Sequence, residues 1–250
     1  MKKLSIIAIT LFSVLVSCKK DEETSNSNET GTVKIEMEHV WGMNAADFHL
    51  NHEFVHPMTG DSMNFATFKY YMSNFKLKKA DGTWWIHPNS YFLVDLSQPS
   101  TLSLDLSMVP TGEYTEMSYL LGVDSLSNIA GAQTGALAVS NNMFWSWNSG
   151  YIMVKAEGTS PQSSTGSFAF HLGGFKGANN VLTTKNISFA ANNLTVGANK
   201  TSKVFVVSNP AKLFHADPLS SGTNLMMPGA KAKQMATNYY SSFAFDHLEE

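Results

Sequence analysis

The stretch FATFKYYMSNFKLKK, residues 65–79, decides the fold class of this 250-residue chain. It is rich in aromatic residues, which are enriched in β-strands, and it contains no proline or glycine. We therefore expect one or two strands here, followed by a turn at Asp81-Gly82. Upstream, residues 32–39 alternate strictly, so that one face of a predicted strand carries Val33, Ile35, Met37 and His39.

Short segments of the same kind continue to the end of the chain. They cover residues 84–86, 91–94, 102–106, 115–121, 151–157, 167–172, 203–207 and 243–248. Helix signals are weak, and only residues 230–240 predict a short helix, after Pro228-Gly229. Many short strands separated by Gly, Pro, Asn and Asp predict an all-β fold, an antiparallel β-sandwich or a barrel-like domain, over residues 32–250.

The N-terminus indicates export. Met1-Lys2-Lys3 is positively charged, and residues 4–16 are an apolar run too short for a membrane span, which needs about 20 residues. The run ends Leu15-Val16-Ser17-Cys18, the pattern of a bacterial lipobox. We predict a lipoprotein signal peptide over residues 1–17 and lipidation of Cys18, which would attach the protein to a membrane. The alternative is an ordinary signal peptide with a chance cysteine.

Residues 18–31 predict a flexible tether, because they include no large apolar side chain to bury. The charged run at 19–23 is similar to the surface-export signals of Bacteroidetes lipoproteins. The expected location is therefore the cell envelope, at the outer membrane, either facing the periplasm or exposed at the surface.

Composition excludes several functions. All 17 basic residues are Lys, and the lack of Arg together with a net charge of −3 argues against nucleic-acid binding. Cys18 is the only cysteine, so the predicted domain has no disulfide and no thiol chemistry. Because no catalytic motif is found, we expect a protein that is not an enzyme.

Eight histidines are the best candidates for chemistry. His49, His52 and His56 are interpreted as exposed residues of a hairpin or loop. His39, His171 and His247 instead fall within predicted strands, and His247 continues the phase of Phe243 and Phe245. A bound metal could satisfy each imidazole, and so could a backbone carbonyl, a tyrosine hydroxyl or a water.

Several motifs together resemble the MbnP family, in the form found among Bacteroidetes lipoproteins. They span nearly the whole predicted domain: FKYYMSNFKL at 68–77, Gly-Val-Asp at 122–124, residues 131–137, MFWSWNSGY at 143–151, FHLGG at 170–174, Asn238 and Asp246-His247.

The resemblance implies an extracytoplasmic copper-binding protein. It implies His171 as a metal ligand most directly, because its local motif is intact, followed by His39 and His247. Zinc would accept the same imidazoles. In methanotroph members of the family a di-haem partner enzyme oxidises a tryptophan to kynurenine at the copper site, which makes Trp145 and Trp147 candidates here. This chain departs from those members at residues 127–130, which read Ser-Asn-Ile-Ala where they carry Asn-His-Ala-Asp.

A second hypothesis requires no metal. Trp41, Trp84 and Trp85 lie near predicted turns. If they are exposed, they would suit a surface-anchored module that binds glycan or protein.

Overall fold

The computed structural model describes residues 29–145, 150–189 and 192–249. The predicted signal peptide, Cys18 and most of the predicted tether lie outside these residues, and so does Trp147. In the described part of the chain, no helix is long and apolar enough to cross a membrane.

Two β-sheets form most of the fold. The larger is built around β4 (Ser62–Lys79), an 18-residue strand that covers the stretch quoted first. Its main path also includes β11 (Thr183–Ser188), β8 (Gly112–Leu121), β9 (Ile152–Thr159), β10 (Ser167–Gly173) and β14 (Asn224–Leu225). Four short strands pair along β4 and β8: β3 (Glu53–Val55), β5 (Trp84–Ile86), β6 (Tyr91–Asp95) and β12 (Leu194–Val196).

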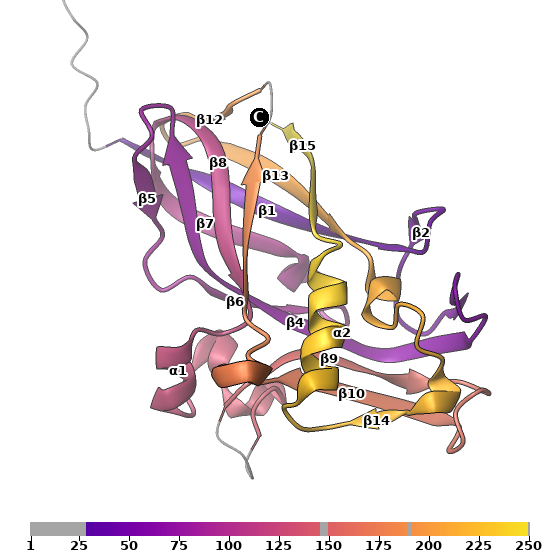
Figure 1. Ribbon diagram of the computed structural model, residues 1–250. Helices are drawn as coiled ribbons and strands as arrows, with labels where there is room; N and C mark the ends of the chain where they lie inside the picture. The colour runs from indigo at the N-terminus through magenta and orange to yellow at the C-terminus, as the bar shows by residue number, and fades with distance from the viewer. Residues whose placement is uncertain (1–28, 146–149, 190–191, 250) are drawn as a thin grey trace, which may run out of the picture.

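The smaller sheet is built around β1 (Thr30–Trp41), which runs from the left of Figure 1 to β2 on the right. Its other strands are β2 (Ala46–Asp47), β7 (Ser103–Pro110), β13 (Thr201–Ser208) and β15 (Ala244–Glu249). The all-β prediction is confirmed, and most pairings are antiparallel as expected. The exceptions in the described chain are β1 with β13 and β10 with β14, which are parallel. β1 and β13 are far apart in sequence, so no hairpin forces them to be antiparallel.

An aromatic core fills the space between the sheets. Phe65, Phe68 and Tyr70 on β4 are fully buried, and their rings contact one another edge to face. α2 (Ala230–Tyr240) spans the residues predicted to be helical and buries Tyr239 against Phe68 and Tyr70. Burial of large aromatic side chains is the main stabilising contribution to such a core.

The sequence did not predict the smaller elements. They include the helix α1 (Ser125–Ala130) and six 3-10 helices: Pro99–Leu102, Gly135–Leu137, Val139–Asn141, Gly177–Asn179, Pro210–Leu213 and Leu219–Ser221. Asp124 caps α1 by accepting a hydrogen bond from the Ser127 amide. The strand β11 was also missed, because its sequence TTKNIS is polar and lies at a sheet edge.

Candidate functional site

The three strand-borne histidines occupy three separate places. The core face of the larger sheet is marked by three buried residues that pair across neighbouring strands: Tyr70 of β4, Val154 of β9 and Leu172 of β10. Side chains alternate between faces along a strand, so His171 lies on the opposite, outer face. His39 contacts Tyr70 on the core side, while His247 lies on the smaller sheet. The larger sheet therefore separates His39 from His171.

His39 is buried, as its strand phase predicted. Its Nε2 is hydrogen-bonded to the Tyr70 hydroxyl at 3.0 Å. Burial lowers the pKa of His39 to about 4, so the ring is neutral at physiological pH. Among the partners considered for this imidazole, the structure provides a tyrosine hydroxyl. Nearby, Ser208 and Tyr239 share a further buried hydrogen bond of 3.1 Å.

His171 is half-buried in a row of charged residues. Across the outer face Asp95, Lys69, Lys155 and His171 stand opposite one another on β6, β4, β9 and β10. The His171 Nε2–H donates to Glu157 Oε1 at 2.6 Å. This hydrogen bond, with a smaller contribution from Lys155, lowers the pKa of Glu157 to about 2. The partner Glu157 could not be found from the sequence, although it shares an outward strand phase with Lys155.

His247 is exposed, so the expectation that it continues the phase of Phe243 into the core is wrong. The pairing of β15 with β13 shifts register between Val204 and Val206, which breaks the simple alternation. The His247 ring stacks on Phe205 at 4.1 Å between centroids, and its Nδ1–H donates to Asp246. That hydrogen bond is the main cause that raises the pKa of His247.

The described residues contain no group of three or more His, Cys, Asp or Glu placed to hold a metal ion. His39, His171 and His247 are therefore not brought together as one ligand set. Whether any of them binds metal remains a prediction.

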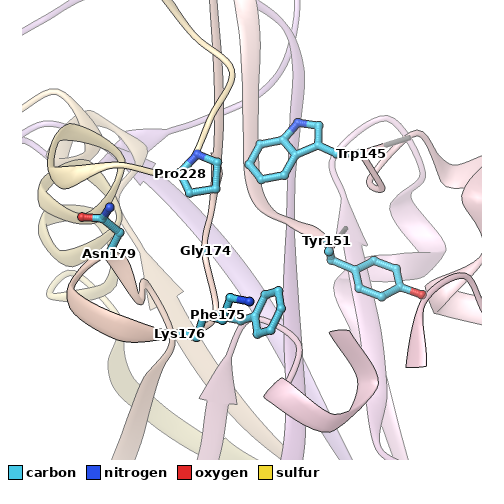
Figure 2. A pocket seen from close by; sticks show the side chains of 8 residues that line it. Trp145, Tyr151, Gly174, Phe175, Lys176, Asn179 and Pro228 are labelled. Atoms are coloured by element: carbon cyan, nitrogen blue, oxygen red, sulfur yellow. The ribbon is translucent and has the colours of Figure 1, made fainter. Parts of the chain in front are cut away.

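Trp145 links two of the sequence motifs. A Cβ atom added to Gly173 would lie 2.5 Å from the Trp145 ring, so only glycine allows the indole to pack there. Gly173 lies two residues after His171 on β10, beyond a register shift between Leu172 and Gly173 in the pairing with β9. Trp145 also lines a pocket of about 400 Å³ with Tyr151, Phe175 and Lys176 (Figure 2). The Trp-rich segment and the His-Leu-Gly-Gly strand therefore meet at Gly173.

Asn128 has a structural role in the segment that departs from the methanotroph pattern. It is fully buried, its amide donates to Val123 O at 2.6 Å, and its Oδ1 accepts from the Tyr151 amide at 2.8 Å. The next residue, Ile129, is 72% exposed. Asn128 therefore ties α1 to the Trp-rich segment, and no imidazole follows it.

The other histidines only partly match the interpretation as exposed loop residues. His49 and His52 are exposed, as expected. For His56 the interpretation is wrong, because its ring is buried: Nε2–H donates to Ala211 O at 2.9 Å, and Nδ1 accepts from the Thr59 amide. The partner Ala211 lies 155 residues away, and no local pattern predicted this contact.

The three tryptophans of the second hypothesis, which requires them to be exposed, differ in their exposure to solvent. Trp84 is 41% exposed and Trp85 is half-buried. Trp41 is buried and stacks on Phe48, so its expected exposure is wrong.

Together the fold and these sites define an all-β protein whose two sheets enclose an aromatic core. The family model described as MbnP matches residues 30–234, and the chain belongs to the MbnP family. A solved structure, MbnP from Methylosinus trichosporium, is similar in fold with a TM-score of 0.53 and 14% identity. The alignment covers 81% of this chain and 82% of that one. No curated protein matches the chain.

Proposed function

We propose that this protein binds copper outside the cytoplasm, with His171 as its principal ligand, and that its role is acquisition or sequestration rather than catalysis. Membership of the MbnP family supports the proposal. The observation that carries it is the hydrogen bond from His171 Nε2–H to Glu157, which leaves Nδ1 as the nitrogen with a free lone pair.

This arrangement is typical of metal-binding histidines. Their second ring nitrogen commonly donates to a carboxylate, which fixes the tautomer and makes the ligating nitrogen more basic. Lys155 lies 3.4 Å from the same Glu157 carboxylate and balances its charge. Imidazole suits copper and zinc alike, so zinc is the competing metal.

His39 fits a metal less well than His171 does. The residue is 8% exposed, and its Nε2 is already hydrogen-bonded to the Tyr70 hydroxyl. A metal ion there would have to enter the aromatic core, where an uncompensated charge is costly. His247 is exposed and also donates to a carboxylate, but its other nitrogen, Nε2, lies 3.7 Å from Glu249 Oε1, and Phe205 covers one face of the ring.

Copper titration of the purified full chain tests the proposal. All variants carry Cys18→Ser, so that no thiol competes for the metal. We expect His171→Ala to lose one equivalent of Cu(II) and Glu157→Gln to weaken the same equivalent by about 10–100-fold. His247→Ala is the matched exposed control. Equal binding by wild type and His171→Ala would contradict the proposal.

The proposal also includes where the protein lies in the cell. The segment Leu15-Val16-Ser17-Cys18 supports lipid attachment, and the proposed location is the cell envelope, at the outer membrane. We expect the wild-type chain to fractionate with membranes and Cys18→Ala to be released from them. Co-fractionation of both proteins with the membrane would contradict lipid attachment.

The resemblance also implies a di-haem partner enzyme that oxidises a tryptophan. Of the two candidates, Trp145 lies within the described residues; it packs at Gly173, two residues from His171, and is 5% exposed. Mass spectrometry of the protein from its native cells, with Trp145→Phe as the comparison, would reveal kynurenine. An unmodified Trp145 would remove this part of the proposal.

Binding of glycan or protein without metal is the second candidate function, and the exposed Trp84 favours it. Lys78 Nζ lies 5.8 Å from the Trp84 ring centroid, which leaves a charged and aromatic surface on β4 and β5. Loss of glycan binding in Trp84→Ala, in a metal-free protein, would support this alternative.

A further inference from the structure

His49 and His52 lie side by side on the turn between β2 and β3. Both side chains are exposed, and their ring centroids are 4.7 Å apart. Neither ring makes a hydrogen bond within the described part of the chain, so no protein group occupies their ring nitrogens there. We propose that this pair is a metal site separate from His171, open to solvent and suited to Cu(II).

The backbone holds the turn at both ends. The Phe48 amide donates to His39 O at 2.9 Å, and the Asn51 amide donates to Phe65 O at 2.8 Å. Asn51 adopts φ +60°, a conformation that asparagine tolerates better than most residues. The two imidazoles are therefore presented by a turn anchored to β1 and β4.

Phe54 limits the orientation of both rings. This buried side chain meets the His49 ring at 5.8 Å and 77° and the His52 ring at 4.8 Å and 69°. Both contacts are edge-to-face, a favoured arrangement for aromatic rings. Because the rings are already confined, binding a metal costs less side-chain entropy than it would on a free loop.

The spacing of the rings indicates the geometry of the site. A metal at about 2.0 Å from an imidazole nitrogen lies about 3.2 Å from the ring centroid. When one nitrogen of each ring turns toward a shared metal, centroids 4.7 Å apart subtend about 95° at that metal. This is close to the right angle between neighbouring ligands in a tetragonal site, the preferred geometry of Cu(II) and Ni(II). Cu(II) binds more tightly in the usual order of affinities.

The remaining ligand positions belong to water, since the described chain supplies no third His, Cys, Asp or Glu in a metal-binding group. The exposed carboxylates of Asp47 and Glu53 flank the turn in sequence and favour a cation nearby. The turn lies near β2, at the far end of the 12-residue β1 from Thr30, about 40 Å along the strand (Figure 1). The pair is thus far from the end at which the chain enters the domain.

Copper titration with electron paramagnetic resonance tests the proposal, using the full chain with Cys18→Ser. We expect the double variant His49→Ala/His52→Ala to lose one equivalent of Cu(II) whose spectrum shows two nitrogen ligands. Each single variant should weaken that equivalent by at least about tenfold, because chelation by the second ring is lost. The control His215→Asn changes another exposed histidine and should leave binding unchanged.

The outcome is independent of the His171 proposal. In His171→Ala the two-nitrogen signal should persist, and in the double variant the His171 equivalent should remain. Since His49 and His52 are exposed, the double variant should keep the unfolding temperature of the parent. A folded double variant that binds Cu(II) with unchanged stoichiometry and affinity would overturn the inference.

Discussion

The two faces of the larger sheet give a histidine very different surroundings. On the core face Phe68 and Tyr70 are fully buried, and His39, which reaches this face from β1 of the smaller sheet, is hydrogen-bonded to Tyr70. On the outer face His171 lies in a charged row and donates to a carboxylate. A histidine enclosed by aromatic rings therefore serves the fold, while the carboxylate that holds His171 fixes the ring in the way that is common for metal-binding histidines.

The largest expected effect lies on the core face. Phe68→Ala should lower the free energy of unfolding by about 3–5 kcal/mol, because the ring is fully buried and the cavity left behind collapses only partly. Urea unfolding checks this value. Trp84→Ala, at an exposed position, should change stability by less than about 0.5 kcal/mol. Similar losses in both variants would show that the core assignment is wrong.

Gly173→Ala tests the contact between the Trp145 ring and Gly173 of β10. The added methyl group would lie 2.5 Å from the indole and 2.9 Å from Tyr151 O. Overpacking of this kind costs about 1–3 kcal/mol and should shift the tryptophan fluorescence. Gly82→Ala probes a glycine with open space around it but a φ of +88°, and so measures backbone strain alone. No greater loss in Gly173→Ala than in Gly82→Ala would contradict the contact.

The pH dependence separates the buried histidine from the exposed one. Burial lowers the pKa of His39 to about 4, so the unfolded chain binds this proton more readily than the native chain. Stability from this group is complete above pH 6.5 and falls as the pH drops toward 4, by about 1–2 kcal/mol at pH 5. Nuclear magnetic resonance should show His39 titrating well below His247, whose pKa is raised. Equal titration of the two rings would refute this contrast.

The smallest effect on stability is expected on the outer face. Glu157→Gln removes a charge from a partly exposed group, so unfolding should change by about 1 kcal/mol or less. The same variant should weaken copper binding, as proposed above. A large loss of stability with unchanged copper binding would show that the Glu157–His171 pair serves the fold.

Local patterns in the sequence were sufficient for much of the fold. Alternation predicted β1 and the burial of His39, and residues 230–240 were correctly predicted as the helix α2. The pattern failed at His247, because a register shift between β13 and β15 cannot be read from one strand.

The candidate site was less predictable than the fold. The motif around His171 made this residue a candidate, but its partner Glu157 lies on another strand and is found only from cross-strand pairing. The contact between Trp145 and Gly173 and the position of His56 against Ala211 likewise depend on segments that meet only in the folded chain.

Anomalous X-ray diffraction at the copper edge, on crystals of the protein loaded with Cu(II), tests the central claim most directly. Copper bound by His171 predicts an anomalous peak about 2.0 Å from Nδ1, with Nε2 still donating to Glu157. No peak at His171 in crystals that show copper at His49 and His52 would contradict the claim that His171 is the principal ligand.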